Sequence, residues 1–543
     1  MSDGLVLVGL SGSGKSTIGR RVAELLRRRF VDTDALIQQR VGKPASAYLR
    51  DHGEPAFREV ERQAVVDATR EAGAVIAAGG GAVADPLNRW DLWHHGTVAW
   101  LRAPEPVLLR RLSADTEPRP MLEPNPQARV AALATERAPF YRAADLQVDA
   151  SGPVEAVAQA ILVQSPSRAP ATRVLFDAEV PRHHPLGPPR ARVVMGIDLD
   201  ADAVRRATVA VEHSAPSIIV DRAVARLLPH LVAALPARRC LAIAGGERAK
   251  RLRRLEQLLE WLASGAHERG APVFAVGGGT IGDLVGTAVA LYARGVPLVQ
   301  VPTTWLAQAD SAFGGKVGVD LGAVKNAAGA FWPPAAVIGD VAALRTLPPA
   351  RRRDGMTESL KAALIGDPTL WHLIEEHGRA ALRGDERTRY AIVERTARVK
   401  LAVCERDPFE VDERRTLNLG HTIGHALEAE SRYRLPHGPA VAIGLRAAMA
   451  IAAGRGADPD LPARLDAVLL KLGFSLRRAF DSSAVRAALL HDKKRTRGRQ
   501  RWILPMAIGR VVEVDDVTEP ELNVVLSAIF AADGPASAGA SAP

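Results

Sequence analysis

The most specific chemical pattern in the sequence is a glycine-rich segment that runs from Gly9 to Ser16 and ends in Gly-Lys-Ser. It lies between a short apolar run and an amphipathic segment, the strand–loop–helix context in which such loops bind phosphate. Backbone N–H groups and the start of the helix favour an anion, Lys15 can reach the β- and γ-phosphates, and Ser16 can coordinate Mg²⁺. The pattern predicts a site for ATP and Mg²⁺, formed by Gly12, Gly14, Lys15, Ser16 and Thr17.

Two acidic residues, Asp32 and Asp34, follow the next apolar segment. Because they stand two positions apart at the end of an expected strand, their side chains point the same way. One could organise Mg²⁺, and the other could hold or deprotonate an acceptor hydroxyl, as phosphoryl transfer requires. Capping of the following helix is an equally good interpretation of the pair on its own.

Further polar motifs follow in the first third of the chain. They are Phe57-Arg58-x-x-Glu61, three glycines at 79–81, Arg119-Pro120-Met121-Leu122 and Glu136-Arg137. A single arginine is more often a surface residue than a ligand. In this order and spacing, however, the motifs resemble shikimate kinase across residues 1–165. The resemblance implies a P-loop kinase fold that phosphorylates shikimate with ATP.

The resemblance also implies roles for individual residues. Lys15 and Asp34 would act in catalysis, Asp32 would support Mg²⁺ with Ser16, and Arg119 would cover the ATP phosphates from a closing lid. Two arginines facing a carboxylate make physical sense, because guanidinium pairs with carboxylate through two hydrogen bonds. The shikimate-binding residues would be Asp34, Arg58, Gly80 and Arg137.

A second glycine-rich turn, at 277–279, follows the apolar run 273–276 and opens an expected helix. A strand-to-helix turn of this kind is typical of a dinucleotide pyrophosphate site, although a simple tight turn is a serious alternative. Asp221 ends an earlier expected strand, where a carboxylate could hold an adenosine ribose. The turn therefore indicates a dinucleotide cofactor without proving one.

Histidines and cations gather in the second half. His421 and His425 are one helical turn apart, a common way to bind a divalent metal, although a capping or core pair is the alternative. Charged and amide side chains accompany them in a fixed order, and they suit a substrate with phosphate and carboxylate groups. They are Lys316, Lys325-Asn326, Glu358-x-x-Lys361, Lys400 and Arg414-x-x-x-Asn418, followed by His437-Gly438. This constellation resembles 3-dehydroquinate synthase from about residue 192 to 530.

This second resemblance implies NAD and a Zn²⁺ or Co²⁺ ion, and it changes the interpretation of the histidines. The metal ligands would be Glu358, His421 and His437, while His425 would hydrogen-bond the substrate and help proton transfer. Catalysis would also involve Lys361, Arg414 and Asn418, and substrate binding Asp310, Lys316, Lys325, Asn326, Lys400 and one of Lys493 and Lys494. The NAD-binding residues would be Asp221, Glu247, Lys250, Gly278, Gly279, Asp283, Thr303 and Thr304.

The implied reaction converts 3-deoxy-D-arabino-heptulosonate 7-phosphate to 3-dehydroquinate and phosphate, with NAD recycled in each turnover. Three positions depart from the family pattern: Ala312, Thr357 and Pro439, the last of which could alter the backbone beside His437. A metal-dependent polyol dehydrogenase, which would release NADH, is the nearest alternative for this half. For the first half, the alternative is a kinase-like module that regulates without catalysis.

The elements that must position these residues divide the chain into several domains. Short apolar runs at 5–8, 75–78, 97–101 and 146–148 alternate with helical patterns, which predicts an α/β fold with a parallel sheet. A second α/β part is expected at 192–347, with strands at 218–220, 241–244, 273–276 and 298–301, and a mainly α-helical metal- and substrate-binding part at 348–530. Residues 166–191 are expected to be a proline-rich linker, and 531–543 a disordered tail.

Composition limits the possible partners. The net charge of +10 suits anionic small molecules, and the basic run 493–499 has no interleaved aromatic residues, which argues against nucleic-acid binding. No stretch predicts a membrane span or a secretory signal, and two separate cysteines indicate a reducing compartment. We expect a cytoplasmic enzyme, with a homodimer through the second half as one possible assembly.

Overall fold

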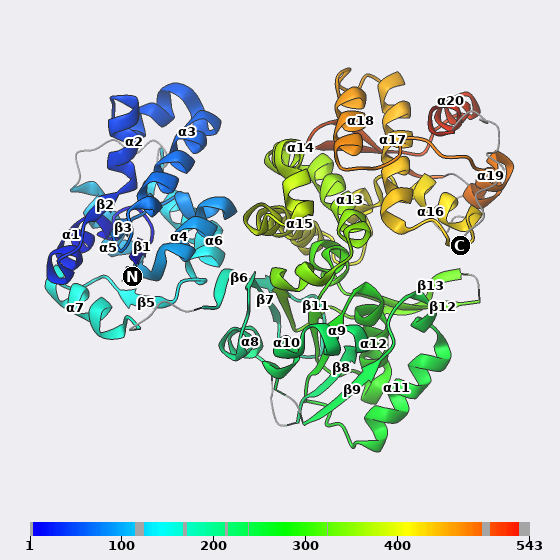
Figure 1. Ribbon diagram of the computed structural model, residues 1–543, viewed down its shortest axis with the longest axis horizontal. Helices are drawn as coiled ribbons and strands as arrows, with labels where there is room; N and C mark the ends of the chain where they lie inside the picture. The colour runs from blue at the N-terminus through cyan, green and yellow to red at the C-terminus, as the bar shows by residue number, and fades with distance from the viewer. Residues whose placement is uncertain are drawn as a thin grey trace, which may run out of the picture.

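The computed structural model describes residues 4–114, 124–166, 171–211, 215–236, 238–322, 324–490 and 500–530. Three units follow one another along the chain (Figure 1). The first unit reaches residue 166, the second spans 171–347, and the third spans 348–530. The first two are α/β layers, and the third is mainly helical, as the sequence predicts.

The first unit is built on a five-stranded parallel sheet of order β2-β3-β1-β4-β5. Alternate residues of its central strand pack on opposite faces: Leu5 and Leu7 against one set of helices, Val6 and Val8 against the other. The strands are β1 (Gly4–Val8), β2 (Phe30–Asp32), β3 (Val75–Ala77), β4 (Gly96–Arg102) and β5 (Leu146–Asp149). The helices are α1 (Lys15–Leu26), α2 (Thr33–Val41), α3 (Ala45–Arg70), η1 (Ala82–Ala84), α4 (Pro86–His95), α5 (Glu105–Ser113), α6 (Pro126–Tyr141) and α7 (Val154–Gln164).

The second unit contains a seven-stranded sheet of order β6-β7-β14-β11-β10-β8-β9, parallel except for β6. Its inner strands are apolar on both faces because helices cover both. The strands are β6 (Arg173–Pro181), β7 (Arg190–Ile197), β8 (Ser217–Asp221), β9 (Arg239–Ile243), β10 (Val273–Gly277), β11 (Leu298–Pro302) and β14 (Ala336–Asp340), with a separate hairpin of β12 (Lys316–Leu321) and β13 (Val324–Phe331). The helices are α8 (Ala201–Thr208), α9 (Arg222–Leu227), α10 (Pro229–Ala233), η3 (Glu247–Ala249), α11 (Leu252–Ser264), α12 (Gly279–Leu291), η4 (Tyr292–Arg294), η5 (Ala307–Ser311) and η6 (Val341–Thr346).

The third unit is a helical body in which α17 packs against α13, α16, α18 and α20. A two-stranded sheet closes one side of it. Its elements are α13 (Pro349–Gly366), α14 (Pro368–Arg383), α15 (Glu386–Arg406), η7 (Glu413–Asn418), α16 (His421–Glu430), α17 (His437–Gly454), α18 (Leu461–Lys471), α19 (Ser482–Leu490), β15 (Trp502–Ala507), β16 (Arg510–Val514) and α20 (Glu519–Ile529). Among the described residues, no helix combines the length and hydrophobicity that a bilayer crossing needs.

The expectation of a linker at 166–191 is wrong for residues 173–181 and for the last two residues, 190 and 191. Strand β6 occupies 173–181 and pairs antiparallel with β7 at the edge of the second sheet. Its first six residues are buried, and four of the prolines that suggested a linker (Pro181, Pro185, Pro188 and Pro189) lie at its end and in the loop after it. Proline interrupts pairing only where its missing N–H is needed, so an edge strand tolerates it at its last position. The predicted tail, 531–543, lies outside the described residues.

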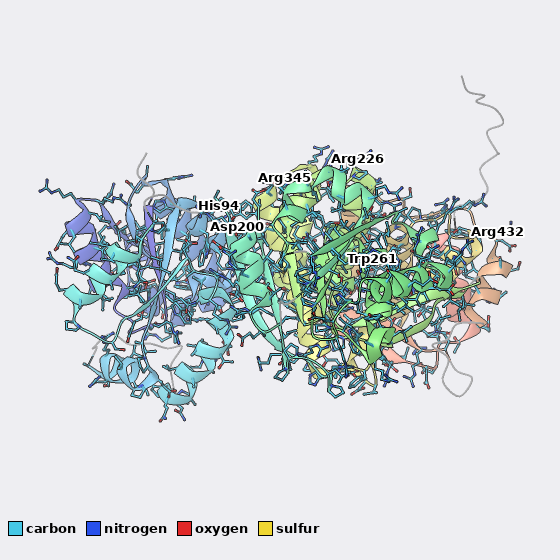
Figure 2. All side chains as sticks on the ribbon, turned by 90° about the horizontal axis from the view of Figure 1, so that it is seen from below. His94, Asp200, Arg226, Trp261, Arg345 and Arg432 are labelled. Carbon is cyan, nitrogen blue, oxygen red and sulfur yellow. The ribbon has the colours of Figure 1, made fainter. Side chains whose placement is uncertain are left out.

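The first unit packs directly on helix α15 of the third unit (Figure 1). Arg89 of α4 and Glu394 of α15 form an ion pair in which both side chains are fully buried. Beside it, Arg387 makes two hydrogen bonds to Asp91, at 2.7 and 2.6 Å. Figure 2 shows the same junction from below, with His94 at the edge of the first unit. The two halves of the chain are therefore docked rather than only tethered.

Replacing Glu394 by glutamine tests this buried pair. The change leaves the charge of Arg89 buried without its carboxylate, so we expect the free energy of unfolding to fall by about 3 kcal/mol. Glu386→Gln on the same helix is the control, because Glu386 and Arg345 pair with side chains 26% and 46% exposed. An exposed pair should cost less than about 1 kcal/mol. Urea unfolding followed by circular dichroism measures both, and equal losses would contradict the expectation.

Candidate active sites

The glycine-rich loop connects β1 to α1, as the motif predicts. Gly12 and Gly14 have φ values of 82° and 89°, the left-handed region that glycine adopts without strain. Lys15 Nζ donates to the carbonyl oxygens of Gly9 and Leu10, at 2.9 and 3.0 Å. The ammonium group thus lies along the loop, where phosphate oxygens can replace the carbonyls as its partners.

Asp32 satisfies both interpretations that the sequence left open. One carboxylate oxygen caps helix α2 by accepting a hydrogen bond from the Asp34 amide at 3.0 Å. The other accepts a hydrogen bond from Ser16 Oγ at 2.6 Å. The same carboxylate therefore ends the strand and stands beside the loop hydroxyl, where it can hold Mg²⁺ or its waters.

The other predicted residues of the kinase domain line the same cavity as the glycine-rich loop. The cavity, of about 840 Å³, is lined by Gly12, Gly14, Lys15, Ser16, Thr17, Asp32, Asp34, Arg58, Gly80 and Arg137, among others. Arg58 is fixed by Glu61 at 2.7 Å, and Arg137 donates to the carbonyl of Gly80 at 2.8 Å. A Cβ atom on Gly81 would stand 2.7 Å from Nη1 of Arg58, so a side chain at this position would displace the Arg58 guanidinium. Arg119 lies outside the described residues.

The second glycine turn joins β10 to α12 at the carboxyl edge of the seven-stranded sheet. A Cβ atom on Gly278 would lie 3.0 Å from Thr304, and one on Gly279 would lie 2.8 Å from Ser311. Thr303 follows β11 and donates its amide to Gly277 at 2.9 Å. Because the turn carries no side chains, a pyrophosphate can reach the backbone amides at the start of α12.

Polar residues surround this turn. Lys250 pairs with Asp283 at 2.5 Å, and burial raises the pKa of Asp283 to about 6 although Lys250 opposes the shift. Glu247 lies 3.4 Å from Lys325, which connects the cofactor side to the substrate cleft. Asp221 ends the neighbouring strand β8 and caps α9 through the Ala223 amide, at 2.8 Å. Asp221 therefore caps a helix, and its position at the same sheet edge also suits a hydrogen bond to a ribose.

The predicted metal ligands come together from three helices. Glu358 lies in the middle of α13, whereas His421 and His437 are the first residues of α16 and α17. One ligand atom from each lies within 4.8 Å of the others. His437 Nε2 is 3.2 Å and His421 Nε2 is 3.7 Å from the same Glu358 oxygen. A carboxylate and two imidazoles facing one point fit a divalent cation of the zinc type.

The helical spacing alone pointed to His421 and His425, but the described side chains that group closely enough to share one ion are Glu358, His421 and His437, without His425. Its ring centroid lies 5.1 Å from that of His421 and 6.5 Å from that of His437, and it lines the adjoining cleft. Burial lowers the pKa of His437, but hydrogen bonds to Glu358 and Glu428 outweigh this effect and raise it to about 10. Glu358 and Glu428 therefore favour a positive charge at the position of His437.

A cleft of about 890 Å³ adjoins the predicted metal ligands. It is lined by Lys316, Lys325, Asn326, Asn418 and His425, together with Glu410, Arg415 and Glu428. Near Lys316, Lys400 pairs with Asp310 at 2.6 Å, and beside the histidines Lys361 pairs with Glu358. Cations and amides from the hairpin and the helical unit thus face one space, as a phosphorylated acid requires.

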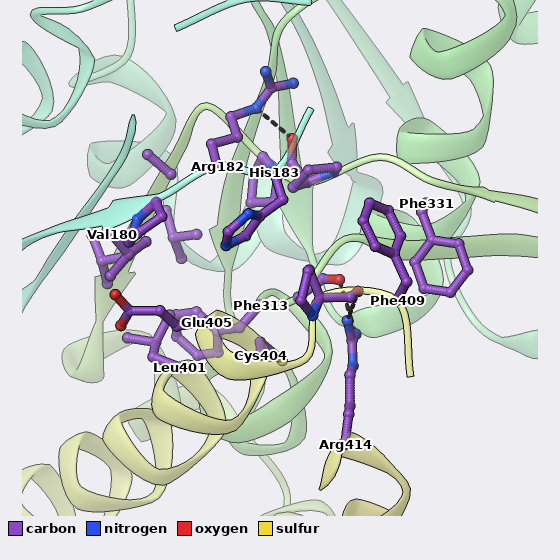
Figure 3. A pocket seen from close by; sticks show the side chains of 18 residues that line it. Val180, Arg182, His183, Phe313, Phe331, Leu401, Cys404, Glu405, Phe409 and Arg414 are labelled. Carbon is purple, nitrogen blue, oxygen red and sulfur yellow. Dashed lines mark hydrogen bonds between the residues drawn. The ribbon is translucent and has the colours of Figure 1, made fainter. Parts of the chain in front are cut away.

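Arg414 lines another cavity and not this cleft. Its guanidinium donates to the carbonyl oxygens of Gly314 and Pro408, at 2.8 and 2.5 Å. Figure 3 shows it beside Phe331 and Phe409, at the edge of a separate apolar cavity of about 60 Å³. The neighbouring Arg415 lines the cleft instead. Lys493 and Lys494 lie outside the described residues.

Sequence reasoning missed two acidic residues in this cleft. Glu410 accepts a hydrogen bond from Asn418 at 2.9 Å, pairs with Lys316, and has a left-handed backbone (φ 60°). Glu428 accepts a hydrogen bond from Nδ1 of His437 at 3.4 Å. Neither belongs to a short motif. For Glu428, the only signal was its place two turns after His421 on one helix.

Pro439, the departure two residues after His437, leaves the helix intact. It is the third residue of α17, and a first-turn amide has no partner within its own helix. A proline there removes no helical hydrogen bond, so His437 keeps its place at the start of α17. Ala312 and Thr357 are buried and do not displace Asp310 or Glu358 from the site.

Family models match both halves of the chain. The model described as shikimate kinase matches residues 11–165. Those described as 3-dehydroquinate synthase N-terminal and C-terminal match residues 240–354 and 355–495.

Similar proteins include enzymes of two names. A 3-dehydroquinate synthase of Xanthomonas campestris pv. campestris (strain 8004) is 40% identical over 296 residues, which are 53% of this chain and 80% of that protein. A 2-epi-valiolone synthase of Actinosynnema mirum is 39% identical over 292 residues, 52% of this chain and 76% of that protein. The solved 2-epi-5-epi-valiolone synthase of Streptomyces hygroscopicus subsp. jinggangensis 5008, with NAD⁺ and Zn²⁺ bound, is 29% identical, with a TM-score of 0.58 over 64% of this chain and 98% of its own.

Glu428→Gln tests the support of the metal ligands. We expect affinity for Zn²⁺ to fall about 10- to 100-fold, because the partner that orients His437 loses its charge. Glu430→Gln is the matched control, since Glu430 ends the same helix and accepts a hydrogen bond from the Asp481 amide. Competition with a chromophoric chelator measures both affinities. Equal affinities in the two variants would exclude a supporting role for Glu428.

Proposed function

Because the chain belongs to the 3-dehydroquinate synthase family and carries a shikimate kinase domain ahead of it, we propose specific roles for the residues of its two sites. The first activity is the ATP-dependent phosphorylation of shikimate. The second converts 3-deoxy-D-arabino-heptulosonate 7-phosphate to 3-dehydroquinate and phosphate. Relatives of the second half carry two enzyme names at nearly equal identity. The observation that favours 3-dehydroquinate is the shikimate kinase domain in the same chain, since both reactions then serve one route to aromatic compounds.

In the kinase domain, we assign Asp34 as the group that accepts the proton of the shikimate hydroxyl. Arg58, held by Glu61, and Arg137, held by Gly80, present guanidinium groups that suit the shikimate carboxylate. Lys15 holds the transferred phosphate, and Ser16 with Asp32 holds Mg²⁺. When bound, ATP and Mg²⁺ supply the phosphoryl group and neutralise its charge. We assign Arg119 to the ATP phosphates, as the resemblance to shikimate kinase implies.

In the synthase part, we assign Glu358, His421 and His437 to the metal and the turn at Gly278 and Gly279 to NAD. When bound, NAD supplies reversible hydride transfer, and the metal polarises a substrate oxygen. Asp221, Glu247, Lys250, Asp283, Thr303 and Thr304 complete the cofactor side. Lys250 neutralises Asp283 there, so that a bound pyrophosphate meets little repulsion.

The substrate itself is held by the residues of the cleft. Lys316, Lys325 and Asn326 come from the β12–β13 hairpin and Asn418 from η7. We also assign to the substrate the ion pair of Asp310 and Lys400, which lies near Lys316. We assign His425, which lines the cleft beside the metal ligands, to proton transfer at the substrate. Lys361 stabilises the charge of Glu358, and Arg414 orders the wall by binding two carbonyl groups.

Location and assembly are also proposals. Free Cys240 and Cys404 support a reducing compartment, the cytoplasm. We propose a homodimer through the synthase part, supported by exposed apolar side chains on the β12–β13 hairpin: Leu321, Val324 and Phe331. Light scattering of the purified chain gives its mass.

Paired substitutions test whether the two sites are separate. Lys15→Ala should lower the rate of shikimate phosphorylation at least about 1000-fold, because the transferred phosphate loses its cation. Glu358→Gln should remove phosphate release from the heptulosonate to a similar extent, because a charged metal ligand is lost. Each variant should keep the other activity within about twofold. Loss of both activities in one folded variant would contradict independent sites.

A spectroscopic assay separates the synthase from a polyol dehydrogenase. If NAD is recycled in each turnover, phosphate accumulates without net NADH, because each hydride removed is returned. Absorbance at about 340 nm therefore stays flat while phosphate is released from the heptulosonate. Steady growth of that absorbance with a simple polyol, and no phosphate release, would favour the dehydrogenase instead.

A further inference from the structure

The segment after the three glycines of the shikimate site faces the synthase part. This segment is η1, and two of its backbone carbonyls accept hydrogen bonds from arginine side chains. Val83 O is bound by Arg89 of the same domain, and Ala84 O lies 3.5 Å from Nη1 of Arg398 on α15. A side chain of the synthase part thus reaches the backbone three residues beyond Gly81.

Arg398 also contacts the helix that carries the shikimate arginine. Its guanidinium lies over the ring of Phe140, 5.0 Å from the centroid, and Arg89 lies over the same ring at 4.3 Å. On α6, Phe140 stands between Arg137 and Tyr141, which both donate to Gly80 O, at 2.8 and 2.7 Å. The two arginines therefore support, through Phe140, the residues that fix the glycine turn.

One carboxylate orients both arginines. Glu394 is fully buried, pairs with Arg89, and lies 3.7 Å from Arg398, four residues further along α15. Its charge fixes a guanidinium from each half of the chain at the same junction. Arrangements of this kind hold a geometry more than they add stability, because desolvating the charges offsets much of their attraction.

We propose that Arg398 is a positioning residue for the shikimate site, acting from the synthase part on η1 and α6. The inference rests on the assignment of the glycine turn and Arg137 to shikimate. The shikimate site then takes its full shape only when the kinase domain is docked on α15. The effect of Arg398 is confined to the shikimate-binding side of the kinase cavity. Arg398 contacts η1 and α6, whereas ATP is held by the loop before α1.

Steady-state kinetics of three full-length variants test the proposal. Arg398→Ala should raise the KM for shikimate about five- to tenfold, the effect of one lost charge-assisted contact. The KM for ATP and the rate of the synthase should stay within about twofold, since neither site contacts Arg398. Arg398→Lys should restore most of the shikimate affinity, because it keeps a cation near Ala84 and Phe140. Arg395→Ala is the control: Arg395 lies on the same helix but pairs with Asp367 of the synthase part, at 2.9 and 2.7 Å.

The outcomes separate this inference from the assignment of the kinase. Shikimate phosphorylation by the unchanged chain tests the assignment on its own. With that activity present, an unchanged shikimate KM in Arg398→Ala overturns the inference. Three other results would also overturn it. In Arg398→Ala, the KM for ATP would rise as much as the KM for shikimate; in Arg395→Ala, the KM for shikimate would rise equally; or Arg398→Lys would not recover the affinity for shikimate.

Discussion

The structure depends on one constraint: phosphate groups must be held by backbone amides at the turn between a parallel strand and a helix. Both halves of the chain place a glycine turn at such a junction, with Gly12 and Gly14 after β1 and Gly278 and Gly279 after β10. Such a turn needs a strand buried on both faces, so each site requires a sheet covered by helices. The catalytic side chains are then supplied by neighbouring strand ends and by the elements packed over that edge.

The synthase part adds a second requirement, a buried carboxylate surrounded by cations. Glu358 is almost fully buried, and Lys361, His421 and His437 come within ion-pair distance of it from three helices. Burial raises the pKa of Glu358, but Lys361 and His437 outweigh burial and lower it below its usual range. The charge that would bind a metal therefore also fixes where α13, α16 and α17 meet.

The sequence predicts local features well because their physics is local. A strand, a glycine loop and a helix start are contiguous, so the phosphate loop and the β10 turn could be recognised directly. The metal site could not be read from spacing, because His437 comes from another helix and helical spacing favoured His425. Glu410 and Glu428 carry no motif, and Arg414 turns toward backbone carbonyls that only the fold brings near. Strand β6 was missed because prolines at its end hid six buried residues.

The junction between the two halves gives the fusion a physical meaning. By family resemblance the two reactions are not consecutive steps of their route, so direct transfer of an intermediate does not explain the contact. If the two halves were only tethered, a linker between them would be enough. Instead, a short segment connects α7 to β6, and α4 packs on α15. A buried ion pair contributes little net stability but strongly favours one orientation. Arg89 of that pair also donates to Val83 of η1, just after the glycine turn, so the proposed role of the junction is to orient the kinase domain.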